Sequence, residues 1–191
     1  MKTNRFGQAA VLSSTQLDQL IAALPAKHHQ VLAEVCRRTG CRISEGRQLT
    51  WASISSTHVT YPKTITKAKL KSRTIPQVPQ LRQVLEQWRA DWRTINGREP
   101  IKGDFVFPGR FAGQCLSSRA FMDALNTASH KCGFEGVSSH SFRRSALTSA
   151  HNAGVPLSHL MALSGHESMS ALQRYLHVTE FEKDQAAMTF A

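Results

Sequence analysis

The order of the hydrophobic spacings along the chain restricts its fold more than any other feature. Apolar residues recur at helical intervals before residue 50 and again after residue 80, and the segment between them is rich in β-branched residues and turn formers. Within that segment, β-rich fragments occur at residues 58–61, 64–66 and 73–75. Helices, a short sheet and further helices predict an α+β fold that is mostly α, with one small antiparallel β-sheet.

Local signals place several helix ends. Ser13 and Gln16 fit a capping box ahead of a first helix, which Pro25 stops. Gly40 is typical of the left-handed residue that ends a helix, here a second one, and a short third helix is expected after Ser44. Helical spacing predicts later helices near residues 81–92, 120–128 and 140–154, from residue 156 onward, and around Tyr175.

The length of 191 residues fits one domain with small appendages. We expect a basic N-terminal arm over residues 1–12, a main domain over 13–178, and a C-terminal tail over 179–191 whose apolar residues favour a helix exchanged between protomers. The chain has no apolar run of about 18 residues and no apolar segment behind its start, so a membrane or secreted protein is a poor interpretation. The four cysteines form no C-x-x-C pair, which favours reduced thiols in the cytoplasm over a zinc site.

The charge balance points to a polyanionic partner. The chain has 24 Lys and Arg against 13 Asp and Glu, a net charge of +11, and a pI of about 10.1. Cationic side chains displace the counterions condensed on a phosphate backbone, so this balance is typical of nucleic-acid binders. Attraction to an anionic membrane is the alternative, but the basic residues are spread along the chain rather than gathered in one block.

Four local patterns carry side chains suited to phosphate chemistry. They are the arginine of T-G-C-R-I-S-E at residues 39–45, a lysine-rich turn at 66–73, the pair His140 and Arg143, and the pair His166 and Tyr175. Two arginines can present planar forks to one phosphate, a lysine can protonate a leaving oxygen, and a tyrosine hydroxyl can attack phosphorus. Preorganised cations of this kind stabilise a pentacoordinate phosphorane without a metal.

In order and approximate spacing these patterns resemble the boxes of the tyrosine recombinases, the phage-integrase family. Residues 39–54 resemble T-G-x-R-x-S-E with its following W-x-x-I, residues 139–145 the H-x-x-R box, and residues 163–178 the L-G-H…Y box. Taken singly, each box residue has an ordinary structural explanation; the ordered set favours function. The resemblance implies the catalytic-domain fold of that family over residues 13–178.

The resemblance also implies a role for each matching residue. Arg42 and Arg143 would clamp the scissile phosphate, and His140 and His166 would complete the cradle. Tyr175, with His140 assisting removal of its proton, would attack phosphorus to form a 3′-phosphotyrosyl bond. A 5′-hydroxyl would then attack that bond, so that strand exchange needs neither metal nor cofactor.

The lysine-rich turn would supply the proton for the leaving oxygen. Lys67 follows Thr66 as in the family's T-K, and Lys69 is the alternative if the turn holds one extra residue. The basic residues expected to contact backbone phosphates are Lys69, Lys71, Arg73 and Arg144. Two positions depart from the family pattern, because Arg144 stands where histidine is frequent and Ser164 where leucine is frequent.

These observations predict a site-specific recombinase of the cytoplasmic nucleoid that cleaves and rejoins double-stranded DNA. We expect it to act as a homo-multimer, a tetramer, on DNA, with an accessory DNA-bending protein as a further partner. The alternatives are a non-catalytic DNA-binding regulator on the same scaffold and a type IB topoisomerase-like relaxing enzyme. Only 41 residues precede Arg42, which predicts a truncated catalytic domain or a compact family member without the usual N-terminal clamp domain.

Overall fold

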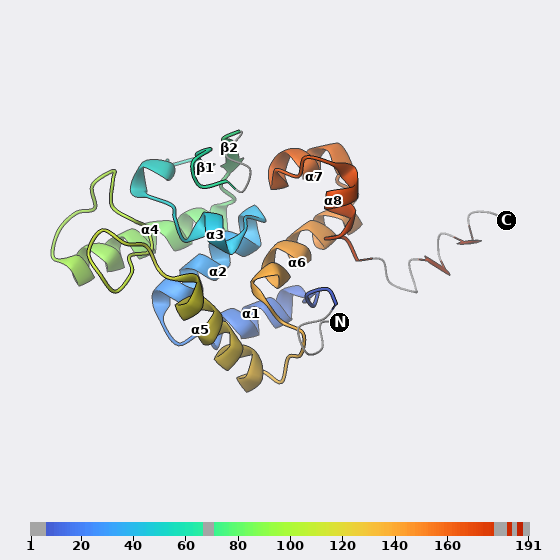
Figure 1. Cartoon of the computed structure of the whole chain (residues 1–191), viewed down its shortest axis with the longest axis horizontal. Coiled ribbons are helices and arrows are strands. Elements are labelled where there is room, and N and C mark those ends of the chain that lie inside the picture. Colours follow the sequence, from blue (N-terminus) through green and yellow to red (C-terminus); the bar gives the residue numbers. More distant parts are fainter. Residues whose placement is uncertain (1–6, 67–70, 178–182, 185–186, 189–191) are drawn as a thin grey trace.

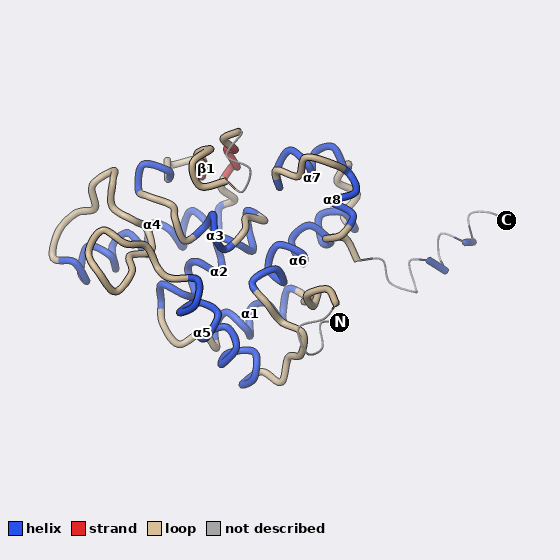
Figure 2. Tube along the Cα trace, viewed as in Figure 1, coloured by secondary structure: helices blue, strands red, loops and turns tan. Residues whose placement is uncertain are grey.

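The structure, a computed structural model, describes residues 7–66, 71–177, 183–184 and 187–188. Helices dominate these residues, and two strands form a hairpin (Figures 1 and 2). In chain order the elements are α1 (Ser14–Ala22), α2 (Lys27–Thr39), α3 (Ile43–Gly46), the 3-10 helix η1 (Trp51–Ser53), β1 (His58–Tyr61), β2 (Arg73–Pro76), α4 (Pro79–Asn96), α5 (Ser118–Lys131), α6 (Ser139–Asn152), α7 (Leu157–Ser164) and α8 (Met169–Gln173). Within the described ranges, no helix combines the length and the apolar character that crossing a bilayer requires.

Helix α2 lies at the centre of the arrangement and packs against α1, α3, α4 and α6. Helix α6 runs from this body toward α7 and α8, which pack against each other beside it (Figure 1). Strands β1 and β2 pair antiparallel with Val59 opposite Ile75, and β2 also contacts α7. The predicted α+β, mostly helical class with one small antiparallel sheet is confirmed.

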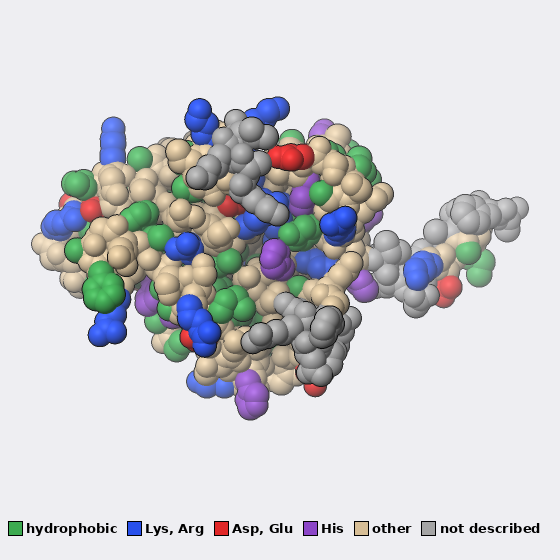
Figure 3. Space-filling view, viewed as in Figure 1, with side chains coloured by type: hydrophobic (Ala, Val, Ile, Leu, Met, Phe, Trp, Pro, Cys, Tyr) green, Lys and Arg blue, Asp and Glu red, His purple; other side chains and the backbone are tan. Residues whose placement is uncertain are grey.

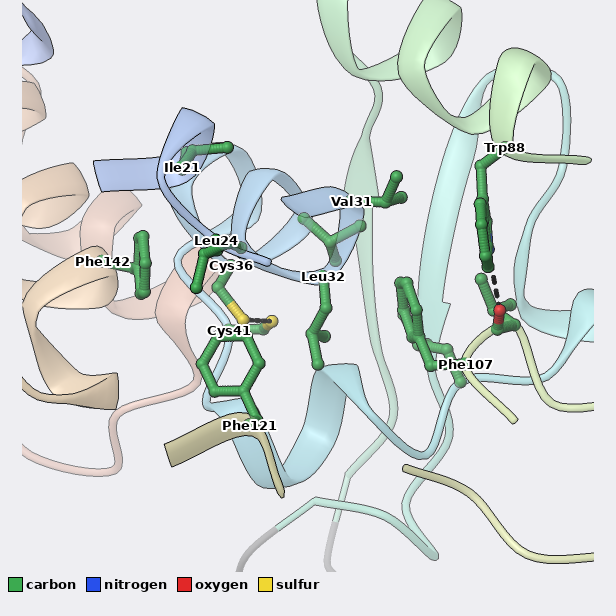
Figure 4. Packing of buried hydrophobic residues seen from close by; sticks show 14 of the residues in the cluster. Ile21, Leu24, Val31, Leu32, Cys36, Cys41, Trp88, Phe107, Phe121 and Phe142 are labelled. Carbon is green, nitrogen blue, oxygen red and sulfur yellow. Dashed lines mark hydrogen bonds between the residues drawn. The ribbon is translucent and has the colours of Figure 1, made fainter. Parts of the chain in front are cut away.

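The main core lies between α2 and the elements around it. Figure 4 shows Leu32 and Phe121 on one side and Trp88 with Phe107 on the other. The indole Nε1 of Trp88 donates to the carbonyl of Val106 at 2.8 Å, so the buried indole N–H has a backbone hydrogen-bond acceptor in the apolar interior. A second, smaller cluster of Leu147, Leu160 and Leu172 joins α6, α7 and α8, and Tyr175 and Leu176 pack against it.

Several predicted helix ends are confirmed, and others move. The Ser13–Gln16 capping box is present, and Gly40 caps α2 in the left-handed conformation at φ 62°. Residues 64–66 form a turn and a bend rather than a strand, just after Pro62 interrupts the β-rich segment. The helix expected around Tyr175 ends at Gln173, so the tyrosine follows α8 instead of lying within it.

The described part of the predicted N-terminal arm packs on the domain. The backbone N–H of Leu12 donates to the Ser145 hydroxyl at 2.8 Å, and that of Ala10 to the Gly136 carbonyl at 2.9 Å. Ala9 and Leu12 are buried. Residues 9–12 therefore pack on the folded unit, although the sequence assigned them to a separate basic arm.

The surroundings of His29 predict that the stability of this fold depends on pH. Its ring is buried beside His28 and Phe121, with no hydrogen-bond partner at either nitrogen. Burial, reinforced by repulsion from His28, lowers the pKa of His29 from 6.5 to about 4. Between these two values the unfolded chain takes up a proton that the folded chain does not, so acidification favours unfolding.

We expect chemical denaturation to show less stability at pH 5 than at pH 7, with His29 contributing on the order of 2 kcal/mol to the loss. In His29→Gln, which cannot titrate, this part of the difference should disappear. Equal pH dependence in parent and variant would contradict the assignment.

Candidate active site

Five of the six residues that the resemblance marks as catalytic line one cavity of about 680 Å³, and Arg144 lines it as well. Arg42 precedes α3, His140 and Arg143 lie in α6, His166 follows α7, and Tyr175 follows α8. Figure 3 shows basic and histidine side chains gathered around a hollow on this face of the molecule. The fold thus assembles the candidate site from elements that are far apart in the sequence.

Arg143 holds a fixed positive charge at the base of the cavity. Its side chain is fully buried, with Nη1 donating to the Gly40 carbonyl at 2.6 Å and Nη2 to the Ser164 carbonyl at 2.8 Å. Burial and then repulsion from Arg42 lower the pKa of Arg143 to about 10, so the guanidinium stays charged at neutral pH. Both carbonyls belong to helix ends, which makes the orientation of the guanidinium a property of the backbone.

His166 is neutral beside this cation. Burial, followed by repulsion from Arg143 and Arg42, lowers the pKa of His166 to about 3. Nη2 of Arg143 lies 3.0 Å from Nε2 of His166, and since a guanidinium can only donate, Nε2 accepts. The ring proton is then on Nδ1, which lies 2.8 Å from the Ser164 hydroxyl and donates to it. Ser164 therefore binds Arg143 through its carbonyl and His166 through its side chain.

Tyr175 lies between the two histidines. Its hydroxyl is 3.2 Å from Nδ1 of His140, and its ring centroid is 4.8 Å from that of His166. The guanidinium carbon of Arg143 lies 5.1 Å from the centre of the tyrosine ring. A phenol hydrogen-bonded to an imidazole can transfer its proton as it becomes a nucleophile.

Arg42 is oriented by Glu45. The Arg42 Nη1 donates to Oε1 of Glu45 at 2.9 Å, and the Arg42 backbone N–H donates to Oε2 at 3.0 Å. Burial by itself would raise the pKa of the Glu45 carboxyl, but Arg73, the backbone N–H of Arg42 and the Arg42 guanidinium lower it below its ordinary value. Glu45 is thus a buried carboxylate that orders the surroundings of Arg42.

Arg73 lies in the interior, whereas the sequence suggested a surface contact with phosphate. Its Nη2 donates to Oε2 of Glu45 at 2.9 Å, and its Nη1 donates to the Ser164 carbonyl at 2.9 Å. The reason is the register of β2, in which Arg73 and Ile75 face inward while Thr74 faces solvent. The structure gives Arg73 internal partners in place of the expected one.

Arg144 differs from expectation in the same way. Its side chain is buried, and Nη1 donates to the Ala9 carbonyl, so that α6 holds the N-terminal segment at the edge of the cavity. Lys71 is exposed and, together with Arg42, lines a groove next to the cavity. Lys67 and Lys69, the two candidates for proton donation, lie outside the described residues.

Sequence reasoning missed two contributors to this site. Ser164 is a fully buried serine at a helix end. The signal that could have marked it is that a polar residue stands at a helical position where an apolar one is expected. Arg174 is exposed and lines the cavity directly before Tyr175, where its charge was the only signal. Among the described residues, no group of three or more His, Cys, Asp or Glu side chains is placed to hold a metal ion.

Comparison with known proteins gives this geometry a context. The model of the phage integrase family matches residues 10–182. Over 152 residues the chain is 30% identical to the tyrosine recombinase XerD of Listeria monocytogenes serotype 4b, covering 79% of this chain and 50% of the relative. Over 160 residues it is 26% identical to the tyrosine recombinase XerC of Bifidobacterium longum (strain DJO10A), covering 81% of this chain and 44% of the relative. The chain spans about half the length of the curated relatives it matches.

Solved structures agree at the level of the fold. The post-cleavage complex of the XerH site-specific recombinase with palindromic difH substrate superposes with a TM-score of 0.75 at 20% sequence identity, over 97% of this chain and 54% of that one. Since the family model covers nearly the whole chain, the chain belongs to the phage integrase family.

Proposed function

We propose that this chain is the catalytic part of a site-specific DNA recombinase, which cleaves and rejoins DNA strands through a 3′-phosphotyrosyl intermediate. One observation carries the proposal: the Tyr175 hydroxyl, hydrogen-bonded to His140, lies at the same cavity as Arg42, Arg143 and His166. The net charge of +11 supports a polyanionic substrate. Two of the similar solved structures are complexes of the XerH site-specific recombinase with its difH substrate.

The proposed cleavage step transfers one phosphoryl group. The Tyr175 oxygen forms a bond to phosphorus while the bond from phosphorus to the 5′-oxygen breaks, and the phenolic proton moves to Nδ1 of His140. The departing 5′-oxygen takes a proton from Lys67 or Lys69. The guanidinium groups of Arg42 and Arg143 neutralise the charge that builds up on the non-bridging oxygens. Attack of a 5′-hydroxyl on the phosphotyrosyl bond reverses the step and joins the new strand.

Strand exchange brings several scissile phosphates into one complex, so we propose a homo-tetramer on double-stranded DNA, assisted by a DNA-bending protein. The tail over residues 179–191 is proposed to pack on a neighbouring protomer. If deletion after residue 178 leaves the sedimentation of the DNA-bound assembly unchanged, this role of the tail is refuted.

The test is covalent trapping. DNA sites are first selected from a random-sequence duplex library by binding to the protein. Selected duplexes are then nicked close to the cleavage point. Cleavage releases a short fragment that carries the 5′-hydroxyl, and because this fragment diffuses away the reaction cannot reverse. We expect a denaturation-resistant protein–DNA adduct and recombinant products from paired sites. Binding without an adduct would favour a regulator, and relaxation of supercoiled plasmid without recombinants would favour a topoisomerase.

Ser164 gives a smaller prediction for the same assay. Ser164→Ala removes the acceptor of the His166 Nδ1–H, and loss of one buried hydrogen bond should slow single-turnover cleavage about tenfold. Ser164→Thr keeps a hydroxyl and should restore part of the rate. The exposed Ser149 on the neighbouring helix provides the control, because Ser149→Ala should cleave at the parental rate. A parental rate in Ser164→Ala would show that the Ser164 hydroxyl has no part in the reaction.

A further inference from the structure

Arg73 is a buried cation at the first position of β2, close to the lysine-rich turn. Only 9% of its surface is exposed, and its guanidinium carbon lies 4.8 Å from the centre of the Tyr61 ring on the paired strand. A buried guanidinium is costly unless its donors are paired. Both terminal nitrogens of Arg73 are paired, one with a carboxylate and one with a carbonyl.

These partners are the groups that orient the two candidate clamp arginines. Glu45 accepts from Arg73 through Oε2 and from Arg42 through both oxygens. The Ser164 carbonyl accepts from Arg73 at 2.9 Å and from Arg143 at 2.8 Å. Arg73 therefore connects the β-hairpin directly to the supports of Arg42 and Arg143.

The end of α7 is shaped around the Arg73 guanidinium. Gly165 has φ +68°, and a Cβ atom there would lie 2.5 Å from Nη1 of Arg73. Glycine at this position satisfies both the left-handed backbone and the close approach of the cation. The turn that carries His166 and the base of the hairpin are thus fitted to each other at one contact.

We propose that Arg73 is a positioning residue for the proton transfer to the leaving oxygen. It fixes the base of the hairpin to Glu45 and Ser164, so that a lysine of the turn and the arginine clamp act on the same phosphate. This inference rests on the proposed function. Arg42 and Arg143 keep anchors of their own when Arg73 is replaced, namely Glu45 and the Gly40 carbonyl; the hairpin loses its hydrogen bonds to Glu45 and to the end of α7.

Leaving-group chemistry separates this role from a role in the clamp. When the bond from phosphorus to a 5′-oxygen breaks, the departing alkoxide needs a proton. A sulfur atom in the same bridging position leaves as a thiolate, which is stable without a proton because thiols are far more acidic than alcohols. A protein with a misplaced proton donor should therefore fail on the oxygen substrate and recover on the sulfur substrate.

The experiment compares single-turnover cleavage of nicked duplexes that carry either a 5′-oxygen or a 5′-bridging sulfur at the scissile phosphate. Arg73→Gln and Arg73→Lys are tested beside Arg82→Gln, which removes an exposed arginine, and Arg143→Lys, which alters the clamp. General acid catalysis contributes about 10² or more, so we expect the Arg73 variants to lose about 100-fold on the oxygen substrate and to cleave the sulfur substrate at nearly the parental rate. Arg82→Gln should match the parent on both, and Arg143→Lys should be slow on both.

Equal losses on both substrates in folded Arg73 variants, or no loss on either, would overturn the positioning role. Thermal unfolding identifies a variant that fails to fold. If Arg73→Gln fails, cleavage of the two substrates by the more conservative Arg73→Lys tests the positioning role. A parent that cleaves neither duplex would instead refute the proposed function, so the two failures are distinguishable.

Discussion

Tyr175→Phe should abolish the covalent protein–DNA adduct while leaving DNA binding intact. The substitution removes one oxygen atom, the one that lies 3.2 Å from His140 and that would bond to phosphorus. The aromatic ring, its packing on the α6–α8 cluster and its contact with Arg143 all remain. Denaturing gel electrophoresis after incubation with the nicked duplex should show no adduct, and a mobility-shift assay should show parental affinity.

The chain offers a matched control, because it contains one other tyrosine. Tyr61 is fully buried, and its hydroxyl lies 2.8 Å from that of Thr39, away from the cavity. Tyr61→Phe should still form the adduct, and peptide mapping of the parental adduct should find the nucleotide on Tyr175. An adduct that persists in Tyr175→Phe would disprove the assignment of the nucleophile.

Arg143→Lys should reduce cleavage by on the order of 10²-fold or more, although the positive charge is kept. Arg143 reaches the Gly40 and Ser164 carbonyls with two separate nitrogens, which a single ammonium cannot reproduce. His166 would also lose the donor that faces its Nε2. Single-turnover cleavage measures the loss, and binding to the same duplex should change little because phosphate contacts elsewhere supply most of the affinity.

Arg144→Lys tests whether position rather than residue type matters. Arg144 is the adjacent buried arginine, but it holds the Ala9 carbonyl instead of the supports of the clamp. We expect a decrease well below that of Arg143→Lys. Similar decreases in the two variants would mean that loss of a buried arginine, not loss of the clamp, explains the result.

The sequence was most informative where function is tied to local pattern. Helical spacing and capping signals identified α1, α2, α4, α5 and α6, because apolar periodicity and helix ends are encoded within a few residues. The boxes around Arg42, His140 and Tyr175 indicated residues that the fold brings to one cavity. These boxes were informative because their order along the chain, and not any single residue, carried the signal.

The internal partners of the charged residues could not be predicted in this way. Whether Arg73 faces a phosphate or Glu45 depends on which side of β2 faces the core, and short strands do not reveal that from their own residues. The role of Ser164 depends on the approach of His166 and of two arginines from separate elements. Side-chain charge suggested DNA contacts at Arg73 and Arg144, whereas tertiary packing gave Arg73 a backbone carbonyl and a carboxylate as partners and gave Arg144 a backbone carbonyl.

The Gly40 and Ser164 carbonyls that hold Arg143 have one more consequence. Their hydrogen bonds form when the polypeptide folds, so the guanidinium is immobilised before a substrate binds. In the proposed reaction, DNA binding then requires no search among side-chain rotamers at this position, and the direction of the guanidinium cannot adapt to a distorted phosphate. Selectivity for a correctly placed phosphodiester would thus depend on a guanidinium of fixed orientation. Any adjustment needed for binding would then have to come from the DNA.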